Sequence, residues 1–582
     1  MISVLKHLSD YAVKYFWEIW VIIPIILVIY GVLSVYKYGL NFYALSSNSD
    51  RINRTKNAET NKIKPKDCLI LILFLGFLSF YIYLILYNED FAYYDESQYL
   101  TTTLRGRNFP LPIWISQGRF WPLGHQEFDL IRLLTQAPVG YHIFPILQLL
   151  IVVATLFIFL IDFPVLFRIS LITIITLTPS FVISFFGLVY PERNIIFWLI
   201  ILLICFQYFL KTRCKLYFCG TLIAAQFALF YKEPIFLLLG GFAGSRLLLQ
   251  GFLERSILQR RGYYQFLKTH CLEVGLLILT GFFFLFYLSI FLPYMNFEYA
   301  RSRSTDIFSI LVSYFQSNLL LDIFIVTLIS RLIYFIYFRQ LPNSFWDSLA
   351  FGAFLYFLSY IKLQIFNSYY MAPVDFIAIL YLGQLIYPWF KEKKVTYSSI
   401  TNLVIFLIVG QNAAYSFYNI AERKNFINGK IQLTKFIIEY TQKGSERHKI
   451  LFFPYSNGYA LMEFSALLEY KGLKLAKHDP PKSTDKLIFT VKSPDQFPVE
   501  DRCIDYEHSL KCFQAKYPQS GDLIIVLPND RVSTKELIQL KQESTLLFHY
   551  QPRPPFVKKI LSLFFFNSRP DTWFHIYVFQ KP

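Results

Sequence analysis

Two adjacent carboxylates follow a long apolar run near the start of the chain. Asp95 and Glu96 stand in the aromatic segment 93–99, a few residues after the apolar run 69–87 ends. Where lipid gives way to water, carboxylates can bind cations or accept protons, and nearby apolar groups can raise their pKa. The pair is therefore a candidate reaction site. The alternative is that both residues only end a membrane helix and begin a solvated turn.

Further charged residues stand at the ends of apolar runs or between them: Arg119, Glu192, Arg193, Lys232, Glu233, Arg301 and Arg303. An ionisable group costs on the order of 2 to 3 kcal/mol at the centre of a membrane helix and less near the interface, so partners or a polar cavity are expected. Acids ringed by cations would suit a phosphate leaving group beside a catalytic base. The alternative is that Glu192 with Arg193, and Lys232 with Glu233, form ordinary interface ion pairs. His125 and Glu127 are too few to define a metal site and are expected to be solvated.

The composition places these residues in a membrane protein. The 582 residues are 55% hydrophobic and 19% aromatic, with a mean hydropathy of +0.41. Apolar runs long enough to cross a bilayer recur along the chain, which excludes a single soluble domain. The net charge of +17 comes mainly from short loops between these runs, where basic residues set topology. Nucleic acid is therefore excluded as a partner.

The apolar runs predict an all-α polytopic domain of about 12 transmembrane helices, at residues 16–36, 69–87, 144–161, 169–189, 194–210, 216–231, 234–249, 272–292, 319–338, 345–361, 371–389 and 398–418. An even number of spans puts both termini on one side. The basic loop 37–68 and the later basic loops then share the opposite side, which the positive-inside rule makes cytoplasmic. We therefore expect Asp95 and both termini to lie outside the cytoplasm.

The chain turns soluble in composition after about residue 421. Short apolar runs predict strands at 449–453, 487–491, 522–527 and 574–579, with helices at 459–470 and 534–542, which together indicate a small α/β domain. Cys503 and Cys512 are its two cysteines; their spacing permits a disulfide without requiring one. The predicted units are 1–68, an extra helix and basic loop; 69–420, the transmembrane domain with the long outer loop 88–143; and 421–582, the extracytoplasmic α/β domain.

The segment Asp95-Glu96-Ser97-Gln98-Tyr99, followed by Gly106 and by Trp121-Pro122-Leu123, resembles the first outer loop of the GT-C class of membrane glycosyltransferases. The closest likeness is to the branch of protein O-mannosyltransferases and lipid A aminoarabinose transferases. Glu192 stands in the short outer turn where such proteins often carry an acid, and Lys232 follows a small apolar helix as their lysine does. The segment 367–373 resembles the aromatic-proline start of a late helix in the same branch.

The resemblance covers roughly residues 69–420, and two features depart from it. The run 16–36 and its basic loop precede what would be the family's first helix. Tyr370 stands one residue beyond the place where an arginine-tyrosine pair is expected, which puts the late contact with the donor phosphate in doubt.

The resemblance implies transfer of a hexosyl or pentosyl group from a polyprenyl-phosphate-linked donor to a glycan, lipid or protein acceptor at the outer face of the membrane. Asp95 would then be the general base, and Glu96 its neighbour in catalysis. The same two carboxylates are the candidate ligands of a divalent cation. The implied ligands of the donor phosphate are Arg119, Arg193, Lys232, Arg301, Arg303 and Tyr370, with Tyr99 and Glu192 as further site residues. Direct displacement would invert the anomeric configuration.

Two other function classes fit a polytopic chain. A lipid or glycan transporter or flippase would also use charges within the membrane. A non-catalytic envelope assembly protein would carry its function in the outer domain. The single Asn-x-Ser/Thr sequon, at Asn53, falls in a predicted cytoplasmic loop. This position favours a bacterial plasma membrane over a lumenal setting.

Overall fold

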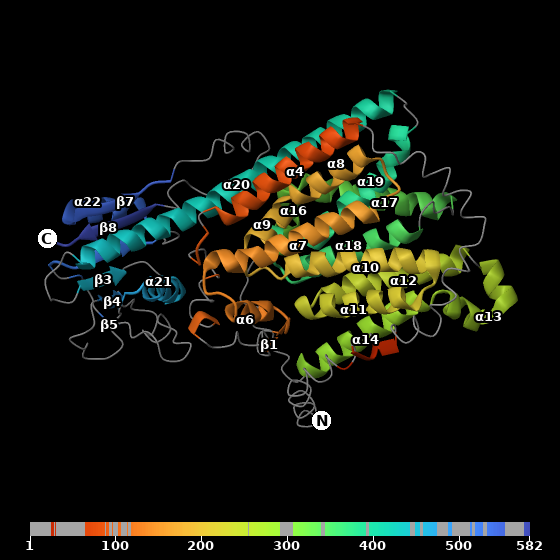
Figure 1. The fold of residues 1–582 in the computed structure, drawn as a ribbon, viewed down its shortest axis with the longest axis horizontal. Helices are drawn as coiled ribbons and strands as arrows, with labels where there is room; N and C mark the ends of the chain where they lie inside the picture. Colours follow the sequence, from red (N-terminus) through yellow and green to blue (C-terminus); the bar gives the residue numbers. More distant parts are fainter. Residues whose placement is uncertain are drawn as a thin grey trace.

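The computed structural model of the chain describes a defined set of residues, from the first predicted span to the C-terminus. They are residues 22, 25–27, 29–30, 65–87, 89–91, 96, 103–105, 113–114, 118–253, 255–291, 306–338, 344–391, 395–442, 449–453, 458–473, 487–491, 513–514, 518, 520–527, 532–552 and 575–582. A helical bundle makes up most of this part of the chain, and a small domain with a β-sheet lies at one end (Figure 1).

The bundle helices are α4 (Pro65–Leu86), α7 (Pro138–Phe159), α8 (Val165–Thr176), α9 (Pro179–Phe186), α10 (Glu192–Thr212), α11 (Lys215–Tyr231), α12 (Ile235–Leu253), α14 (Cys271–Phe291), α16 (Ile307–Ser317), α17 (Leu319–Phe338), α18 (Ser344–Lys362), α19 (Ala372–Lys391) and α20 (Val395–Gln442). Within the described residues, 7 helices are long and apolar enough to cross a membrane, or 8 if the bent pair α8–α9 is one span. The predicted polytopic helical fold is confirmed. The first predicted span, 16–36, lies mostly outside the described residues.

Two predicted spans differ from straight membrane helices. The run 169–189 is broken between α8 and α9, which meet at 68°. Pro179 explains the break, because proline has no N–H to donate and forces Thr178 into an extended conformation. The run 398–418 lies in the first part of α20. The whole helix is 48 residues long, or roughly 72 Å at 1.5 Å per residue.

The helices of the bundle pack closely against one another in its apolar core. The backbones of α12 and α18 approach so closely that a Cβ atom on Gly352 would lie 2.3 Å from the carbonyl oxygen of Leu238. Phe206, Phe242 and Leu349 are fully buried around the same contact. Leu69 and Ile72 of α4 are among the exposed apolar side chains, as expected of a lipid-facing helix.

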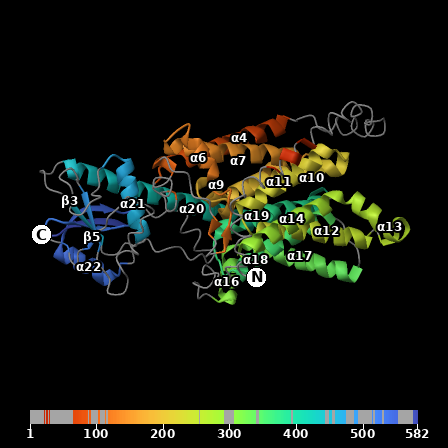
Figure 2. The same cartoon turned by 90° about the horizontal axis from the view of Figure 1, so that it is seen from below.

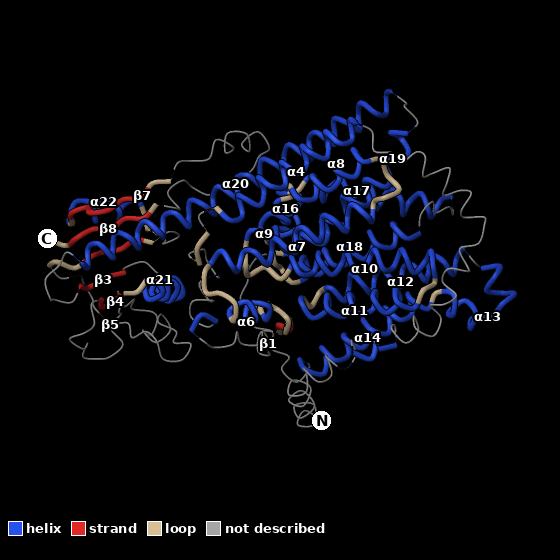
Figure 3. Tube along the Cα trace, in the orientation of Figure 1, coloured by secondary structure: helices blue, strands red, loops and turns tan. Residues whose placement is uncertain are grey.

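The C-terminal domain is built on a six-stranded sheet in the order β5-β4-β3-β6-β8-β7. The strands are β3 (Lys449–Phe453), β4 (Leu487–Val491), β5 (Phe513–Gln514), β6 (Leu523–Val526), β7 (Thr545–Tyr550) and β8 (Ile576–Gln580). The first four in this order are parallel, and β8 pairs antiparallel with β6 and β7. Among the residues that the structure describes, strands lie at this end of the molecule apart from one short pair (Figure 3).

The sheet domain also contains α21 (Gly458–Tyr470) and α22 (Thr534–Glu543). The predicted α/β domain is therefore confirmed, including the four predicted strands, whereas β5 and β7 were missed. Cys503 and Cys512, whose spacing permits a disulfide, lie outside the described residues.

Helix α20 joins the two parts of the molecule (Figure 2). In the bundle, Ser416 Oγ donates to the carbonyl oxygen of Leu177, 2.8 Å away. Further along, the hydroxyl of Tyr550 donates to the carbonyl oxygen of Asn425 at 3.0 Å, and Gly429 packs against Tyr550 and Ile576 of the sheet. The predicted boundary at residues 420–421 thus falls inside a continuous helix.

A short connecting region lies beside this junction. It includes η3 (Thr103–Arg105), the strands β1 (Ile113–Trp114) and β2 (Arg119–Phe120), and α6 (Gln126–Arg132). Phe91 packs there against Tyr141 and Tyr470, which belong to the bundle and the sheet domain respectively. Lys471 Nζ also lies 2.6 Å from Asp90 Oδ2. The domain is therefore docked on the bundle by both apolar and ionic contacts.

Candidate active site

Lys232 and Glu192 meet at the end of the bundle that faces the sheet domain. Helices α10 and α11 form an antiparallel hairpin, so the start of α10 lies beside the end of α11. Glu192 is the first residue of α10, where an acid interacts favourably with the helix dipole. Lys232 ends α11 in an extended conformation. Its Nζ lies 3.2 Å from Oε1 of Glu192, and both side chains are buried.

Aromatic rings enclose the Lys232 ammonium. Its Nζ lies 4.5 Å from the ring centroid of Tyr370 and 5.4 Å from that of Trp121. Tyr370 in turn stacks on Tyr360, with 4.6 Å between centroids, and contacts Tyr369 at 4.3 Å. Ring faces attract a cation, and they pack equally well on the C–H face of a sugar. Tyr370 thus lies next to Lys232, although 138 residues separate them in the numbering.

The ion pair leaves hydrogen-bonding capacity unused. Neither oxygen of Glu192 accepts a hydrogen bond of good geometry from the described residues, although Lys232 Nζ lies within ion-pair distance. A buried carboxylate without such partners costs free energy, and native proteins rarely leave one unsatisfied without a functional reason. The pair is therefore suited to a ligand that brings both an anionic group and hydroxyl groups.

Arg119 reaches the same place through Glu233. Its Nε lies 3.2 Å from Oε1 of Glu233, which also accepts a 2.6 Å hydrogen bond from the backbone N–H of Phe120. The guanidinium lies 5.5 Å from the ring centroid of Trp121. The turn between α11 and α12 therefore holds β2 in place and brings a second cation near Lys232. Arg119, Glu192, Lys232 and Tyr370 form the candidate site.

The ion pairs at this site connect different partners from those considered for the sequence. The alternative in which each acid pairs with its neighbour in the sequence, Glu192 with Arg193 and Glu233 with Lys232, is wrong. Lys232 pairs with Glu192, Arg119 with Glu233, and Arg193 with Glu127. Successive residues at a helix end point in different directions, so each finds a partner on another segment.

Arg193 points into the bundle. Its Nε donates to Oε1 of Gln148 at 2.7 Å, and Nη1 donates to the carbonyl oxygen of Gly187 at 3.1 Å. Nη2 lies 3.4 Å from Oε1 of Glu127, which also accepts from the side chain of Asn194 at 2.8 Å. The guanidinium is fully buried and is bound by protein groups. Its predicted contact with a donor phosphate stays a prediction.

His125 is buried and the Glu127 side chain is only 10% exposed, so the expectation that both are solvated is wrong. Burial, followed by the nearby charges of Arg193 and Lys232, lowers the pKa of His125 to about 3. Burial raises the pKa of Glu127, with the Arg193 charge acting in the opposite direction. His125 therefore stays neutral at physiological pH beside two cations.

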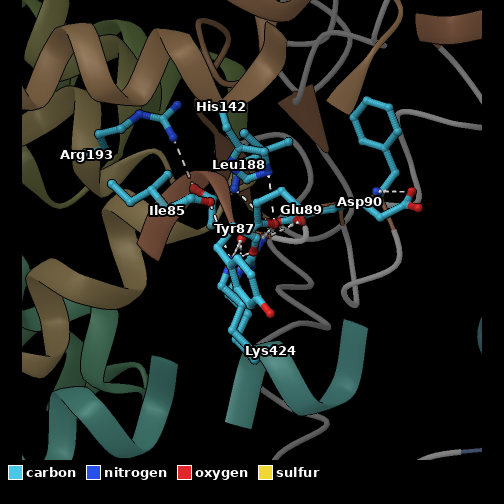
Figure 4. A network of polar contacts seen from close by, with 12 residues as sticks. Ile85, Tyr87, Glu89, Asp90, His142, Leu188, Arg193 and Lys424 are labelled. Atoms are coloured by element: carbon cyan, nitrogen blue, oxygen red, sulfur yellow. Dashed lines mark hydrogen bonds and ion pairs between the residues drawn. The ribbon is translucent and has the colours of Figure 1, made fainter. Parts of the chain in front are cut away.

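Glu96 lies in a second buried cluster that we call the arginine clamp: Glu89, Glu96, His142, Arg423 and Lys424. Figure 4 shows Glu89, His142 and Lys424 of this cluster. Arg423 donates from Nη1 and Nη2 to the two oxygens of Glu96, each at 2.9 Å, and from Nη2 to Glu89 at 2.9 Å. Lys424 binds the other oxygen of Glu89. The backbone N–H of Leu188, in the turn before α10, donates to Glu96 at 2.8 Å. The clamp thus ties α20 to the turn that carries Glu192.

The pKa values of the two carboxyls of the clamp are shifted in opposite directions. Burial by itself would raise the pKa of Glu89, but Arg423, His142 and Lys424 outweigh it and lower the pKa to about 2. Burial raises the pKa of Glu96 despite the charge of Arg423. Glu89 is therefore the firmly ionised member. It was not singled out in the sequence, although it directly follows a predicted span, as Arg423 and Lys424 follow another.

The clamp contains a group of possible metal ligands, Glu89, Glu96 and His142, whose ligand atoms all lie within 4.8 Å of one another. Arg423 and Lys424 already supply two positive charges to the two carboxylates. A divalent cation would have to displace a hydrogen-bonded guanidinium, so the described residues do not favour a metal there. Asp95, the other predicted ligand, lies outside the described residues, as do Tyr99, Arg301 and Arg303.

No protein-family model and no curated protein matches the chain. Among solved structures, the chain is similar to the crystal structure of ArnT from Cupriavidus metallidurans bound to undecaprenyl phosphate. The match covers 88% of this chain and 97% of that one, with 11% sequence identity and a TM-score of 0.39. At this level of similarity the match assigns neither a family nor an activity to the chain.

Proposed function

We propose that this protein transfers a sugar from a polyprenyl-phosphate-linked donor to an acceptor hydroxyl at the bundle end that carries Lys232. The observation that carries the proposal is the environment of this lysine. Its ammonium is buried at a helix end, and it contacts the Glu192 carboxylate and the ring faces of Tyr370 and Trp121. Such a site can bind a phosphate at the head of a membrane-embedded chain and hold a sugar against aromatic rings.

The reaction is a direct displacement. The acceptor hydroxyl attacks the anomeric carbon, and Asp95 takes up its proton as general base. The bond between the anomeric carbon and the phosphate oxygen breaks, and its electron pair leaves with the polyprenyl phosphate. Lys232 and Arg119 stabilise the charge on this leaving group through charge-assisted hydrogen bonds. The displacement inverts the anomeric configuration, and the acceptor is a glycan, a lipid or a protein.

The remaining residues of the site take supporting roles. Glu192 holds Lys232 before the donor binds, and its oxygens accept hydrogen bonds from sugar hydroxyls. Tyr370 packs on the sugar. Arg193 keeps the turn before α10 in place through Gly187 and Glu127. Arg301 and Arg303, which lie outside the described residues, are further cations for the phosphate, and Tyr99 is a further site residue.

The proposed setting is a bacterial plasma membrane, with the site and the sheet domain outside the cytoplasm. Charge placement supports this orientation. Lys211, Arg213 and Lys215 stand at the α10–α11 turn, at the end of this hairpin away from Lys232. Basic residues are enriched on the cytoplasmic side of membrane proteins. The three predicted units, 1–68, 69–420 and 421–582, then correspond to an added helix, the catalytic bundle and an extracytoplasmic domain.

The function is tested by reconstituting the purified protein in vesicles with a labelled sugar on polyprenyl phosphate and a mixture of glycan, lipid and peptide acceptors. Wild-type protein is expected to form a new glycosidic bond. Lys232→Met should lower the rate by about 100-fold or more, because a cation that stabilises the leaving group is lost. Lys211→Met is the matched control, since this lysine is half exposed at the other end of the same hairpin.

Two outcomes would contradict the proposal. Transport of the labelled lipid across the vesicle membrane without a new glycosidic bond would favour a transporter. Transfer by Asp95→Asn at the wild-type rate would remove the proposed base, whatever the behaviour of Lys232→Met.

A further inference from the structure

Asp375 is a buried acid in α19, five residues after Tyr370. Other buried acids in the described bundle pair with cations, as Glu273 does with Arg246 and Asp347 with Arg331. Asp375 instead accepts hydrogen bonds from neutral groups: Ser180 Oγ donates to Oδ2 at 2.5 Å, and Asn318 Nδ2 donates to Oδ1 at 2.9 Å. Because a buried ionisable residue without a cation is costly in a membrane helix, its presence calls for a functional explanation.

Both partners of Asp375 stand at breaks between helices. Ser180 follows the 68° bend between α8 and α9, and Asn318 is the single residue between α16 and α17. Helix α20 bonds to the exposed backbone of the same two breaks. Ser416 donates to the carbonyl oxygen of Leu177, and Gln411 accepts from the N–H of Leu319 at 3.2 Å. One carboxylate thus hydrogen-bonds to residues at both of these breaks.

Each element that Asp375 joins leads to the candidate site. Helix α9 runs into the turn that precedes Glu192. Helix α16 carries Tyr314, whose hydroxyl donates to the carbonyl oxygen of Ile365 at 2.9 Å and accepts from the N–H of Asn367 at 3.3 Å. These bonds hold the segment just before η6 (Ser368–Met371), which contains Tyr370. Helix α19 itself begins directly after η6.

We infer that Asp375 is a positioning residue that sets the separation of Glu192 and Tyr370 on either side of Lys232. The inference rests on the proposed function, since it concerns the geometry of that same site. Lys232 can contact both a carboxylate at 3.2 Å and a ring at 4.5 Å only if the turn before α10 and the start of α19 keep their relative positions. Asp375 links α9 and α19 directly through Ser180.

The chemistry of the link requires an acceptor at position 375. The Oδ1 atom of Asn318 accepts from the N–H of Leu321 at 3.2 Å and so caps α17. This contact turns the amide NH2 of Asn318 toward Asp375, which must therefore offer it an acceptor. Ser180 is a hydroxyl and can donate or accept, so an asparagine at position 375 could keep both contacts if Ser180 donated instead to Oγ1 of Thr178, 3.4 Å away. A leucine has a similar size and offers no acceptor to either partner.

The experiment compares Asp375→Leu, which removes both acceptors, with the exchanged variant Asp375→Asn/Asn318→Asp. In the exchanged variant, the carboxylate introduced at position 318 accepts from the N–H of Leu321 with one oxygen. Its other oxygen accepts from the amide introduced at position 375, and the oxygen of that amide still accepts from Ser180. The link is restored with the same net charge. Asp162→Asn is the control, because Asp162 is exposed and pairs with Lys211 near the other end of the bundle.

Two readouts are measured in lipid nanodiscs. The first is the ¹⁹F resonance of 3-fluorotyrosine incorporated at position 370, which reports the contact with Lys232 and needs no catalysis. The second is kcat and KM for the polyprenyl-phosphate sugar. Asp375→Leu should shift or broaden the resonance and lower kcat/KM by about tenfold, the effect of leaving buried donors unpaired. The exchanged variant should recover the wild-type resonance and most of the lost kcat/KM.

The outcomes separate this inference from the proposed function. If wild-type protein transfers no sugar, the proposed function fails, and the ¹⁹F resonance still decides whether Asp375 positions Tyr370. An unchanged resonance and unchanged kinetics in Asp375→Leu would overturn the inference. So would an exchanged variant that behaves no better than the single one. If Asp375→Leu does not fold, Ser180→Ala, which removes one donor, should shift the resonance in a folded protein; an unshifted resonance there would also overturn it.

Discussion

Arg423→Met removes the cation that joins α20 to both carboxylates of the arginine clamp. The Arg423 side chain is 4% exposed, and it donates to Glu96 and Glu89 at 2.9 Å. Without it, Glu96 keeps only the hydrogen bond from the N–H of Leu188 and has no cation in contact among the described residues. Removing one partner of a buried ion pair costs about 3–5 kcal/mol, because the other charge stays buried and unpaired. The free energy of unfolding should fall by this amount.

A second substitution separates charge from packing. In Arg423→Met/Glu96→Gln, one positive and one negative charge are removed together, and Glu89 keeps its pair with Lys424. No unpaired charge is left, so this variant should recover at least half of the lost free energy. Lys435→Met is the control on the same helix, since Lys435 is exposed, and it should change stability by less than about 0.5 kcal/mol.

The free energies are measured by equilibrium unfolding in mixed micelles with an increasing fraction of SDS, over a range of pH. Because the pKa of Glu89 is lowered from 4.5 to about 2, its stabilising contribution is present above pH 4.5 and is lost as the pH falls toward 2. In Arg423→Met this contribution is weakened, so acid should destabilise the variant less than the wild type. The reasoning is refuted if Arg423→Met stays within about 1 kcal/mol of wild type, or if the double variant is no more stable than the single one.

Two further predictions concern packing and pH. Gly352→Ala should destabilise the bundle by about 3 kcal/mol, because the new Cβ would lie 2.3 Å from the carbonyl oxygen of Leu238. The control Gly281→Ala should be neutral, because its new Cβ would meet nothing within 4 Å. Equal unfolding midpoints for the two variants would contradict this prediction. The pKa of His125 is lowered from 6.5 to about 3, so its contribution to stability is present above pH 6.5 and is lost as the pH falls from 6.5 toward 3. His125→Asn, which tolerates the positive φ of 69° at this position, should reduce that loss by on the order of 2–4 kcal/mol; parallel stability profiles of variant and wild type between pH 4 and 7 would count against it.

Much of the fold could be predicted from hydropathy alone. In a bilayer, backbone groups must be satisfied within the segment, so a long apolar run has little alternative to a helix. Each predicted run from 69–87 to 398–418 accordingly contains helix in the described residues. The break at Pro179 could have been anticipated from the proline itself. The continuation of α20 beyond its apolar part could not, because its polar half is stabilised by contact with the sheet domain.

The candidate site was predictable in part. Glu192, Lys232 and Tyr370 stand at the ends of apolar runs, and the topology of the runs places those ends together, whereas Arg119 lies within the outer loop 88–143. The choice of partners was not predictable. Glu96 pairs with Arg423, 327 residues away, and Glu127 pairs with Arg193. Such contacts depend on how helices pack and rotate, which hydropathy does not encode.

By itself, the sequence determined that the chain folds as a membrane bundle followed by an α/β domain, and which charged residues stand at the lipid boundary. Only the tertiary structure decided that Glu192 faces Lys232 and Tyr370 while its neighbour Arg193 faces the bundle interior. The physical reason is the range of the forces involved. Burial of apolar runs is a property of each segment, whereas a buried charge is stable only beside a partner that packing brings from a distant part of the chain.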